Sequence, residues 1–255
     1  MNTATPSTAL LECYLLLGQS NMAGRGVVKE EDKKPVRNIR VFDAQDKWVN
    51  QGEPIHYDCP EAGAGLGMAM AKERIKRNPE ARIGLIPCAV GGTPLALWQP
   101  GTDLYLKSIR RAKLALSGGI LGGFLWHQGE NDSLESSTAH SYAVRLAGVV
   151  SAYREDLAAP EVPFLAGELG RFLEQNPKTP FANLVNRQIH SLVHTINRFA
   201  VISSEGLGHG HDDPLHFDAN SLQELGRRYE RDLQSIFLGS NGPSKERTKR
   251  AGSKW

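Results

Sequence analysis

The stretch LLLGQSNMAGRG, residues 15–26, is an apolar run that breaks at Gly18 and places Ser20 on a tight turn before a helix. Such a run predicts a strand, and open α/β sheets carry their chemistry at the carboxyl ends of strands. Backbone N–H groups at a helix start have no partner within the helix and could face an oxyanion beside Ser20. A serine at a helix start is also a common N-cap residue, so this stretch alone leaves both roles open.

A second stretch, Asp213-Pro-Leu-His216, supplies the groups that a serine nucleophile needs. A serine hydroxyl attacks well when a neutral imidazole takes its proton and a carboxylate orients that imidazole. The short spacing lets both side chains hydrogen-bond from a single loop. In isolation Asp213 and His216 could instead cap the next helix, but together with Ser20 they favour a Ser-His-Asp triad. The chain contains no G-x-S-x-G, which argues against the usual nucleophile elbow of α/β-hydrolases.

Two more apolar runs end in residues suited to the same site. Residues 82–97, RIGLIPCAVGGTPLAL, lead into Gly91 and Gly92, where a glycine backbone can approach a ligand and offer an N–H group. Residues 122–133, GGFLWHQGENDS, lead into Gln128, whose amide could donate to a developing oxyanion. Such donors are worth about 2.7–4 kcal/mol each in acyl-transfer enzymes. Taken separately, the glycine pair could be an ordinary turn and Gln128 a brace within a loop.

Together these stretches resemble the SGNH-type (GDSL-like) hydrolases, in particular their carbohydrate-esterase branch of acetylxylan esterase-like and sialate O-acetylesterase-like proteins. The resemblance spans about residues 10–238. It implies that Ser20 is the nucleophile and that the backbone N–H groups of Ser20 and Gly92 are oxyanion donors. The four matching segments are GQSNMAGRG at 18–26, AVGGT at 89–93, WHQGE at 126–130 and DPLHF at 213–217.

The third oxyanion donor is the point where the chain departs from the wider SGNH pattern. That pattern is G-x-N-D with asparagine as the donor, whereas the branch resembled here uses the glutamine before the glycine. We therefore expect Gln128 to be the third donor. Residues 129–132, GEND, also fit G-x-N-D, which makes Asn131 the rival.

Alternating strand-like and helix-like runs, together with the resemblance, predict a single three-layer α/β/α domain of the flavodoxin-like, SGNH hydrolase type. We expect a mainly parallel five-stranded sheet. The domain should cover residues 10–238, after a flexible segment 1–9 and before a basic, disordered tail 239–255. The expected strands are the run ending at Gly18, the runs at 82–97, 122–126, 163–168 and 199–203, and a possible short strand at 40–43 in a long polar loop.

Composition argues against several classes of partner but does not assign a function. A chain of 255 residues with 40% hydrophobic residues can bury a full core. Its net charge of +2 gives no reason to expect nucleic acid or anionic membranes as partners. The apolar run near the amino end is too short for a membrane span and lacks the basic start of a signal peptide. We therefore expect a cytoplasmic protein and leave export open.

A metal site that activates water is the main alternative mechanism. It would leave Ser20 and Gln128 without a role, so we expect no metal and no cofactor. A domain that binds acetylated sugar without turnover is a third possibility, against which the complete set of nucleophile, base and carboxylate argues. The residues that could form the metal site lie in one short segment: His209, His211, Asp212, Asp213 and His216.

We therefore expect a serine esterase that removes O-acetyl groups from carbohydrate through an acyl-enzyme. Its substrate would be a small-molecule or oligosaccharide acetyl ester, either an acetylated xylo-oligosaccharide or a sialic acid. The sequence fixes neither the sugar nor the oligomeric state. Four residues beside the matching segments could shape the pocket, although a structural role is an equal alternative for each: Arg25, Trp98, His127 and Glu130.

Overall fold

A seven-stranded sheet forms the middle layer of residues 10–239, the part of the chain that the computed structural model describes. The strand order is β3-β2-β4-β1-β5-β6-β7, and every pair is parallel except β2–β3. The first strand of the chain therefore lies in the centre, between β4 and β5. The strands are β1 (Leu11–Gly18), β2 (Ile39–Phe42), β3 (Trp48–Val49), β4 (Arg82–Pro87), β5 (Gly119–His127), β6 (Phe164–Gly167) and β7 (Phe199–Ile202).

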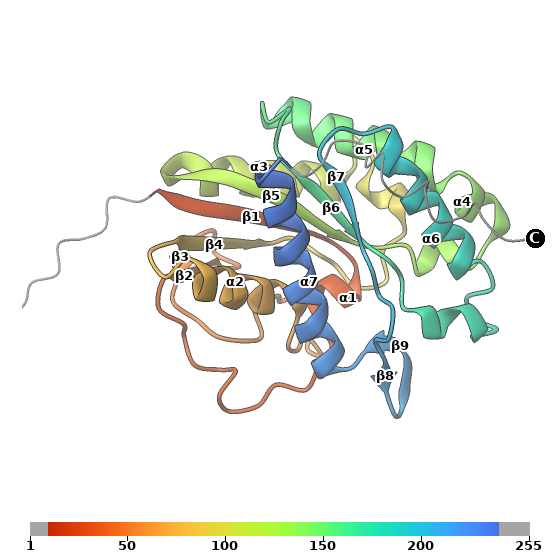
Figure 1. The fold of residues 1–255 in the computed structure, drawn as a ribbon, viewed down its shortest axis with the longest axis horizontal. Coiled ribbons are helices and arrows are strands. Elements are labelled where there is room, and N and C mark those ends of the chain that lie inside the picture. Colours follow the sequence, from red (N-terminus) through yellow and green to blue (C-terminus); the bar gives the residue numbers. More distant parts are fainter. Residues whose placement is uncertain (1–9, 240–255) are drawn as a thin grey trace, which may run out of the picture.

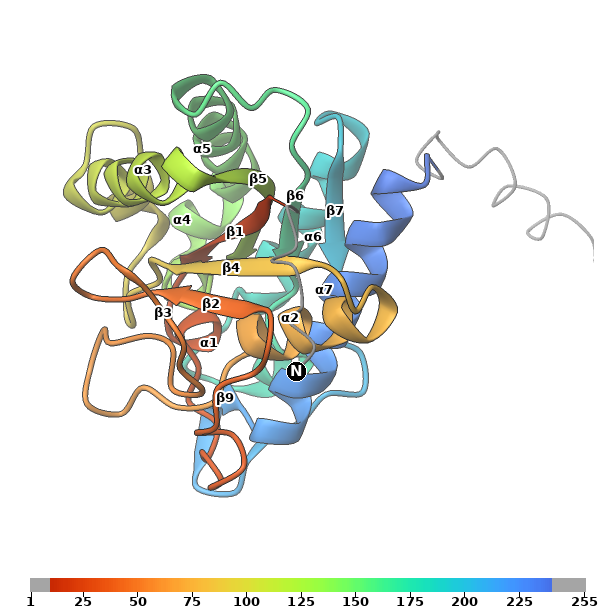
Figure 2. The same cartoon turned by 90° about the vertical axis from the view of Figure 1, so that its left-hand side faces the viewer.

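Helices cover both faces of this sheet (Figures 1 and 2). One face carries α2 (Leu66–Arg77) and α7 (Ala219–Phe237), and the other carries α3 (Asp103–Ala115), α5 (Tyr142–Asp156) and α6 (Ala182–Ser191). The predicted three-layer α/β/α class is thus confirmed. The shorter elements are α1 (Ser20–Ala23), α4 (Ser136–His140) and single 3-10 turns at Leu95–Trp98, Leu116–Gly118, Asn131–Ser133, Arg171–Gln175 and Leu192–His194.

The sequence of β1 reflects its central place. Successive side chains of a strand point to opposite faces of the sheet. Accordingly, Tyr14 and Leu16 pack in the core below α2 and α7, whereas Leu15 and Leu17 pack in the core below α3 and α5. Because both faces are covered, β1 needs a continuous apolar run instead of an alternating one.

The predicted count of five strands was too low. The stretch at 40–43 is a full strand, β2, which pairs in parallel with β4, and β3 adds an antiparallel edge strand. Their sequence signal is weak because β2 has four residues and β3 only two, within a polar loop. Tertiary packing stabilises them: the rings of Phe42 and Trp48 lie 5.0 Å apart.

A two-stranded antiparallel ribbon stands apart from the main sheet (Figure 1). It consists of β8 (His209–Gly210) and β9 (Asp213–Phe217) and lies between β7 and α7 in the chain. This segment was predicted as a loop. The helix after it begins with Asp218 as the N-cap residue, whose side chain accepts a hydrogen bond from Ser221 N at 2.7 Å. Neither Asp213 nor His216 therefore caps α7.

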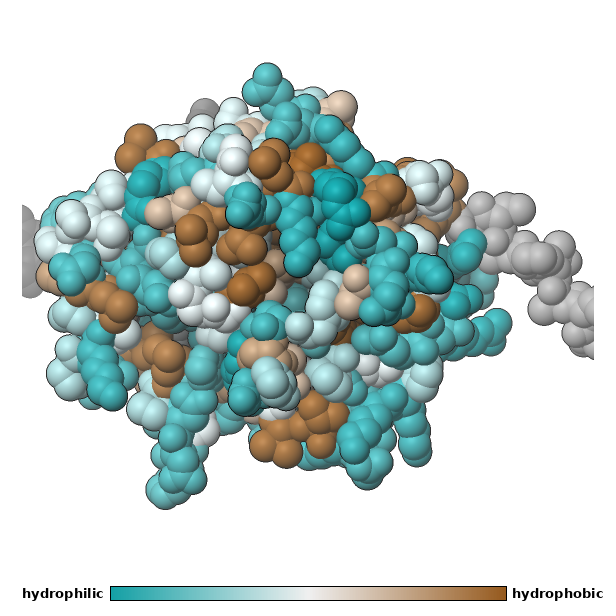
Figure 3. Space-filling model, turned by 180° about the vertical axis from the view of Figure 1, so that it is seen from behind, coloured by the Kyte–Doolittle hydropathy of each residue, from teal (hydrophilic) through white to brown (hydrophobic). Residues whose placement is uncertain are grey.

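Apolar side chains on the face shown in Figure 3 form several small groups separated by hydrophilic side chains. Among residues 10–239, no helix is both long enough and apolar enough to cross a membrane. The flexible segment predicted at 1–9 and the tail predicted at 239–255, apart from Gly239, lie outside the described residues.

Candidate active site

The turn at the end of β1 places Ser20 at the carboxyl edge of the sheet. Gly18 has a φ of +126°, and a Cβ atom there would lie 2.0 Å from the carbonyl oxygen of His127 on β5. Only glycine fits this close approach. The next residue, Gln19, donates its backbone N–H to the same oxygen at 2.9 Å and is the N-cap residue of α1. Ser20 is the first residue of α1, so it does not take the capping role.

The β8–β9 ribbon brings the second predicted stretch to this serine. His216 Nε2 lies 2.8 Å from Ser20 Oγ, and His216 Nδ1 lies 2.6 Å from Asp213 Oδ2. The other carboxylate oxygen of Asp213 accepts the backbone N–H groups of Leu215 and His216 at 3.1 and 3.2 Å. Burial opposes the ionisation of Asp213, but these hydrogen bonds outweigh it and lower the pKa of the carboxyl group. An ionised Asp213 holds the imidazole with Nε2 directed at Ser20.

The loop after β4 lines the same depression as the serine. Gly92 adopts a left-handed φ of +70°, and nothing lies within 4 Å of where its Cβ would be. Within residues 10–239, neither the Ser20 N–H nor the Gly92 N–H donates a hydrogen bond to the protein. Both N–H groups are therefore available to an oxyanion that forms at the serine.

These residues surround an open depression of about 510 Å³. Its volume falls within the range of small-molecule sites. Its lining combines residues from the ends of β1, β4, β5 and the ribbon, which is where an α/β sheet binds its ligand. The lining residues are Gln19, Ser20, Arg25, Asp58, Cys59, Glu61, Gly91, Gly92, Asn131, Asp213, Leu215 and His216.

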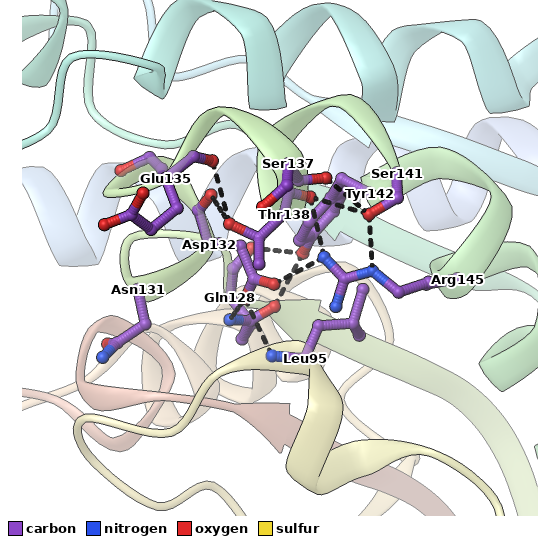
Figure 4. A network of polar contacts seen from close by, with 12 residues as sticks. Leu95, Gln128, Asn131, Asp132, Glu135, Ser137, Thr138, Ser141, Tyr142 and Arg145 are labelled. Atoms are coloured by element: carbon purple, nitrogen blue, oxygen red, sulfur yellow. Dashed lines mark hydrogen bonds and ion pairs between the residues drawn. The ribbon is translucent and has the colours of Figure 1, made fainter.

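Gln128 does not reach this depression, contrary to the expectation that it is the third oxyanion donor. Its side chain is buried in the network of Figure 4, where Nε2 contacts Asp132 Oδ2 at 2.7 Å and the Thr93 carbonyl and Gln19 Oε1 at 3.2 Å each. An amide nitrogen has only two hydrogens to donate, so none is left for an oxyanion. The network also holds Asp132, which accepts from Arg145 at 2.7 Å.

Asn131, the rival, lines the depression and points away from that network (Figure 4). Its Oδ1 accepts a hydrogen bond from Gln19 Nε2 at 3.2 Å. Because the oxygen of the amide faces Gln19, its NH₂ group is left to face the other way. Among residues 10–239, the Asn131 NH₂ group donates no hydrogen bond to the protein, in contrast to that of Gln128.

Trp98 and His127 are core residues, not pocket residues. Trp98 is fully buried, donates to Thr93 Oγ1 at 3.1 Å and packs edge-on against Trp126. His127 is also fully buried and packs against Phe217, and burial lowers the pKa of its imidazole to about 3. Of the two alternatives that the sequence left open for Trp98 and His127, their burial fits the structural one.

Glu130 is buried behind the serine and does not line the depression. Its Oε1 accepts a hydrogen bond from Asn21 Nδ2 at 2.5 Å. Burial raises the pKa of its carboxyl group. Of the four candidate pocket residues, Arg25 is the one that does line the depression.

Arg25 forms an ion pair with Asp58, a residue that the sequence did not single out. Arg25 Nη2 lies 2.7 Å from Asp58 Oδ2, and the same oxygen accepts the Gly91 N–H at 2.8 Å. Arg25 Nη1 also donates to the Gly24 carbonyl at 2.8 Å. The pair therefore joins the loop after β4 to the turn after α1. Asp58 lies in a polar loop without a motif or periodic pattern, so no sequence signal marked it.

The alternative metal site is not assembled. Among residues 10–239, no three His, Cys, Asp or Glu side chains form a group that could hold a metal ion. His211 is exposed, and the His209 ring packs against Phe172 with Nδ1 near the Gly210 carbonyl. Both ring nitrogens of His216 are engaged with Ser20 and Asp213.

The fold resembles that of several solved structures. One is a protein from Arabidopsis thaliana with a TM-score of 0.79 and 27% identity, covering 89% of this chain and 98% of that one. Another is NanS, with a TM-score of 0.72 and 16% identity, covering 90% of this chain and 98% of that one. A carbohydrate acetylesterase from Xanthomonas citri has a TM-score of 0.68 and 17% identity over 89% of this chain and 57% of its own. At such low identity, the last two show a shared fold alone.

Sequence comparison gives the family. A probable carbohydrate esterase from Arabidopsis thaliana is 35% identical over 175 residues, which are 60% of this chain and 67% of that protein. The family model described as carbohydrate esterase, sialic acid-specific acetylesterase matches residues 10–235. That match covers most of the chain and all four segments that carry the site, and the chain therefore belongs to this family of carbohydrate esterases.

Proposed function

We propose that this esterase removes acetyl groups from O-acetylated carbohydrate by acyl transfer through Ser20. The proposal is carried by one observation: the Ser20 hydroxyl lies 2.8 Å from an imidazole whose other nitrogen lies 2.6 Å from a carboxylate. This is the geometry that a general base needs to take a proton from a serine. The substrate class comes from the family, and the depression is large enough for a sugar unit.

In the first half of the reaction, Ser20 Oγ attacks the carbonyl carbon of the acetyl ester while His216 Nε2 takes its proton. Asp213 stabilises the imidazolium through Nδ1–H. The oxyanion of the tetrahedral intermediate accepts the N–H groups of Ser20 and Gly92. His216 then gives the proton to the sugar oxygen, which leaves as an alcohol and leaves acetyl-Ser20 behind.

In the second half, water takes the place of the sugar hydroxyl. His216 removes a proton from the water as it attacks the acetyl carbon, and the same donors hold the second oxyanion. Acetate then leaves and Ser20 regains its proton from His216. Besides the ester and water, these two half-reactions need no group beyond the side chains and N–H groups of the site.

The third oxyanion donor in this proposal is the Nδ2 group of Asn131. Two observations support it over Gln128: Asn131 lines the depression, and Gln19 accounts for the oxygen end of its amide. Gln128 then has a structural role as the partner of Asp132.

The test is acetate release and p-nitrophenyl acetate hydrolysis by Ser20→Ala. We expect turnover to fall by about a thousandfold or more, because the nucleophile is lost. Ser108→Ala is the matched control, since Ser108 is another buried serine but bonds to Tyr105 and Tyr153 away from the site. Its turnover should stay within about twofold of the unsubstituted protein. Equal turnover by both variants would reject Ser20 as the nucleophile.

The sugar itself is identified by comparing substrates. Acetylated xylo-oligosaccharides and O-acetylated sialic acids, assayed side by side for acetate release, separate the two substrates that we propose. Acyl chains longer than acetyl test the acetyl preference in the same assay. Failure with every acetylated sugar, combined with Ser20-dependent hydrolysis of the p-nitrophenyl ester, would keep the serine mechanism and reject the carbohydrate.

A further inference from the structure

Asn21, the residue after the nucleophile, connects three distant parts of the site. It is fully buried, and its Oδ1 accepts the backbone N–H of Phe217 at 3.1 Å. Its Nδ2 lies 2.5 Å from Glu130 Oε1 and 3.4 Å from the Leu215 carbonyl. Leu215 and Phe217 flank His216 in β9. One side chain beside Ser20 therefore holds the strand that carries the imidazole on both sides of it.

Glu130 decides which way the Asn21 amide points. A carboxylate oxygen accepts hydrogen bonds, so it selects the NH₂ end of the amide. The Oδ1 end is then left to face Phe217 N, which is a donor. Exchange of the two ends would set two acceptors against each other at Glu130 and two donors against each other at Phe217.

The ribbon needs such a connection because the main sheet does not hold it. Among residues 10–239, β9 pairs with β8 alone, and these two strands form a sheet of their own. Asp213 cannot anchor His216 to the rest of the protein, since both belong to β9 and the Asp213 side chain is 48% exposed. Phe217 packs against His127 and Phe172, but within the described residues the hydrogen bonds from α1 to the backbone of β9 are those of Asn21.

We propose that Asn21 and Glu130 are a positioning pair that sets the distance between Ser20 Oγ and His216 Nε2. Neither residue touches the substrate; both act through the backbone of β9. The inference rests on the proposed function, because it assigns a role in the proton transfer between Ser20 and His216. Misplacement of a catalytic group by about 1 Å can lower a rate about a hundredfold.

The test compares kcat and KM for p-nitrophenyl acetate in Asn21→Ala, Glu130→Ala and Glu130→Gln, below the unfolding temperature of each variant. Asn21→Ala should lower kcat by about ten- to a hundredfold with KM within about twofold, because the defect is one of alignment. Glu130→Ala should lower kcat about tenfold. Glu130→Gln should restore kcat to within about threefold of the unsubstituted protein, because its amide oxygen still accepts from Asn21.

Asn186→Ala is the matched control. Asn186 is also a buried asparagine that makes two backbone hydrogen bonds, to Leu169 N at 2.8 Å and Leu169 O at 3.2 Å. It does not line the depression. Its substitution should lower the Tm about as much as Asn21→Ala but leave kcat within about twofold. Equal kcat values for the Asn21 and Asn186 variants would overturn the proposal.

Two further variants keep the proposal testable. If Asn21→Ala does not fold, Asn21→Asp keeps an acceptor for Phe217 N and loses the donor to Glu130, so kcat should fall; an unchanged kcat overturns the proposal.

The double variant Asn21→Ala/Glu130→Ala should match Asn21→Ala within about twofold, because the two residues act through one contact. Fully additive losses would overturn the pairing. Ser20→Ala decides the proposed function independently of all these outcomes.

Discussion

His216 and Gly92 both line the depression with Ser20, and the protein holds them in different ways. The Gly92 loop follows β4, which lies next to β1 in the sheet, and Val90 N donates to the Gly18 carbonyl at 3.0 Å just before that loop. The His216 strand belongs to a ribbon outside the sheet. The oxyanion side, which is the Gly92 loop, is thus joined to β1 by a backbone hydrogen bond in addition to the Asp58 side chain, whereas the base side, which is the His216 strand, is joined to α1 by side chains.

This difference indicates where the site tolerates substitution. Backbone ladders of a buried sheet persist when single side chains change, whereas a contact made by one buried amide is lost with that amide. We therefore expect side-chain substitutions to disturb the alignment of His216 more readily than that of the oxyanion donors.

The base side is removed by His216→Ala. We expect kcat/KM for p-nitrophenyl acetate to fall by about a thousandfold or more, since the imidazole that lies 2.8 Å from Ser20 Oγ is lost. The Ser20 and Gly92 N–H groups stay in place, so some rate above the uncatalysed hydrolysis should remain. His209→Ala, on the other strand of the same ribbon, is the control and should stay within about twofold. A comparable loss in both variants would mean that the ribbon, not the imidazole, was damaged.

The oxyanion side is tested by comparing Asn131→Ala with Gln128→Ala. Asn131→Ala should lower kcat by about a hundredfold or more while the Tm stays nearly unchanged, because its NH₂ faces the depression. Gln128→Ala should mainly lower stability, by about 1–3 kcal/mol, because the Thr93 carbonyl loses its Gln128 donor and buried Asp132 loses one of its donors. The reverse pattern, with kcat lost only in the Gln128 variant, would return the donor role to Gln128.

The sequence predicted those groups of the site that follow a strand and belong to a recognisable motif. Ser20, Gly92, Asp213 and His216 all had such a signal, and all of them line the depression. The carboxyl ends of parallel strands meet at one edge of the sheet, so a motif at a strand end has a predictable place. The same argument predicted the layers and the central strands, whereas β2 was predicted only as a possible short strand at 40–43 and β3 was not predicted.

Sequence proximity failed where the direction of a side chain decides. His127 and Gln128 are neighbours of Asn131 in the chain, yet both turn into the protein interior. The sequence did not mark Asn21 as a site residue, although it follows Ser20. Nothing in its own segment indicates that it contacts β9 almost two hundred residues later. Such contacts depend on the tertiary structure and have no local pattern.

A smaller effect concerns how the base side is attached to the sheet. Glu168, just after β6, accepts the backbone N–H of Ser204 at 2.8 Å and lies 2.6 Å from His190 Nε2. Ser204 begins the segment that leads from β7 to the ribbon. Burial opposes ionisation of Glu168, but the hydrogen bonds of His190 and Ser204 N outweigh it and lower the pKa to about 2 from 4.5. The ionised carboxylate therefore fastens this segment to the sheet.

The sign of the pH dependence follows from this shift. Because the folded pKa lies below the unfolded one, the stabilisation is complete above about pH 4.5 and is lost as the pH falls toward 2. Thermal unfolding of Glu168→Gln should show a lower Tm at pH 7, by about 2–4 °C for each kcal/mol lost. The Tm difference from the unsubstituted protein should narrow as the pH falls from about 4.5 toward 2, because protonation then removes from the unsubstituted protein the charge that the variant already lacks.

The matched control is Glu174→Gln, which removes an exposed carboxylate from the turn that follows. Its Tm should stay close to that of the unsubstituted protein at every pH, since an exposed carboxylate contributes little to stability. Parallel Tm curves for Glu168→Gln and the unsubstituted protein would show that Glu168 is not ionised when it binds Ser204. The hydrogen bond between Glu168 and Ser204 would then not depend on a charge on the carboxyl group.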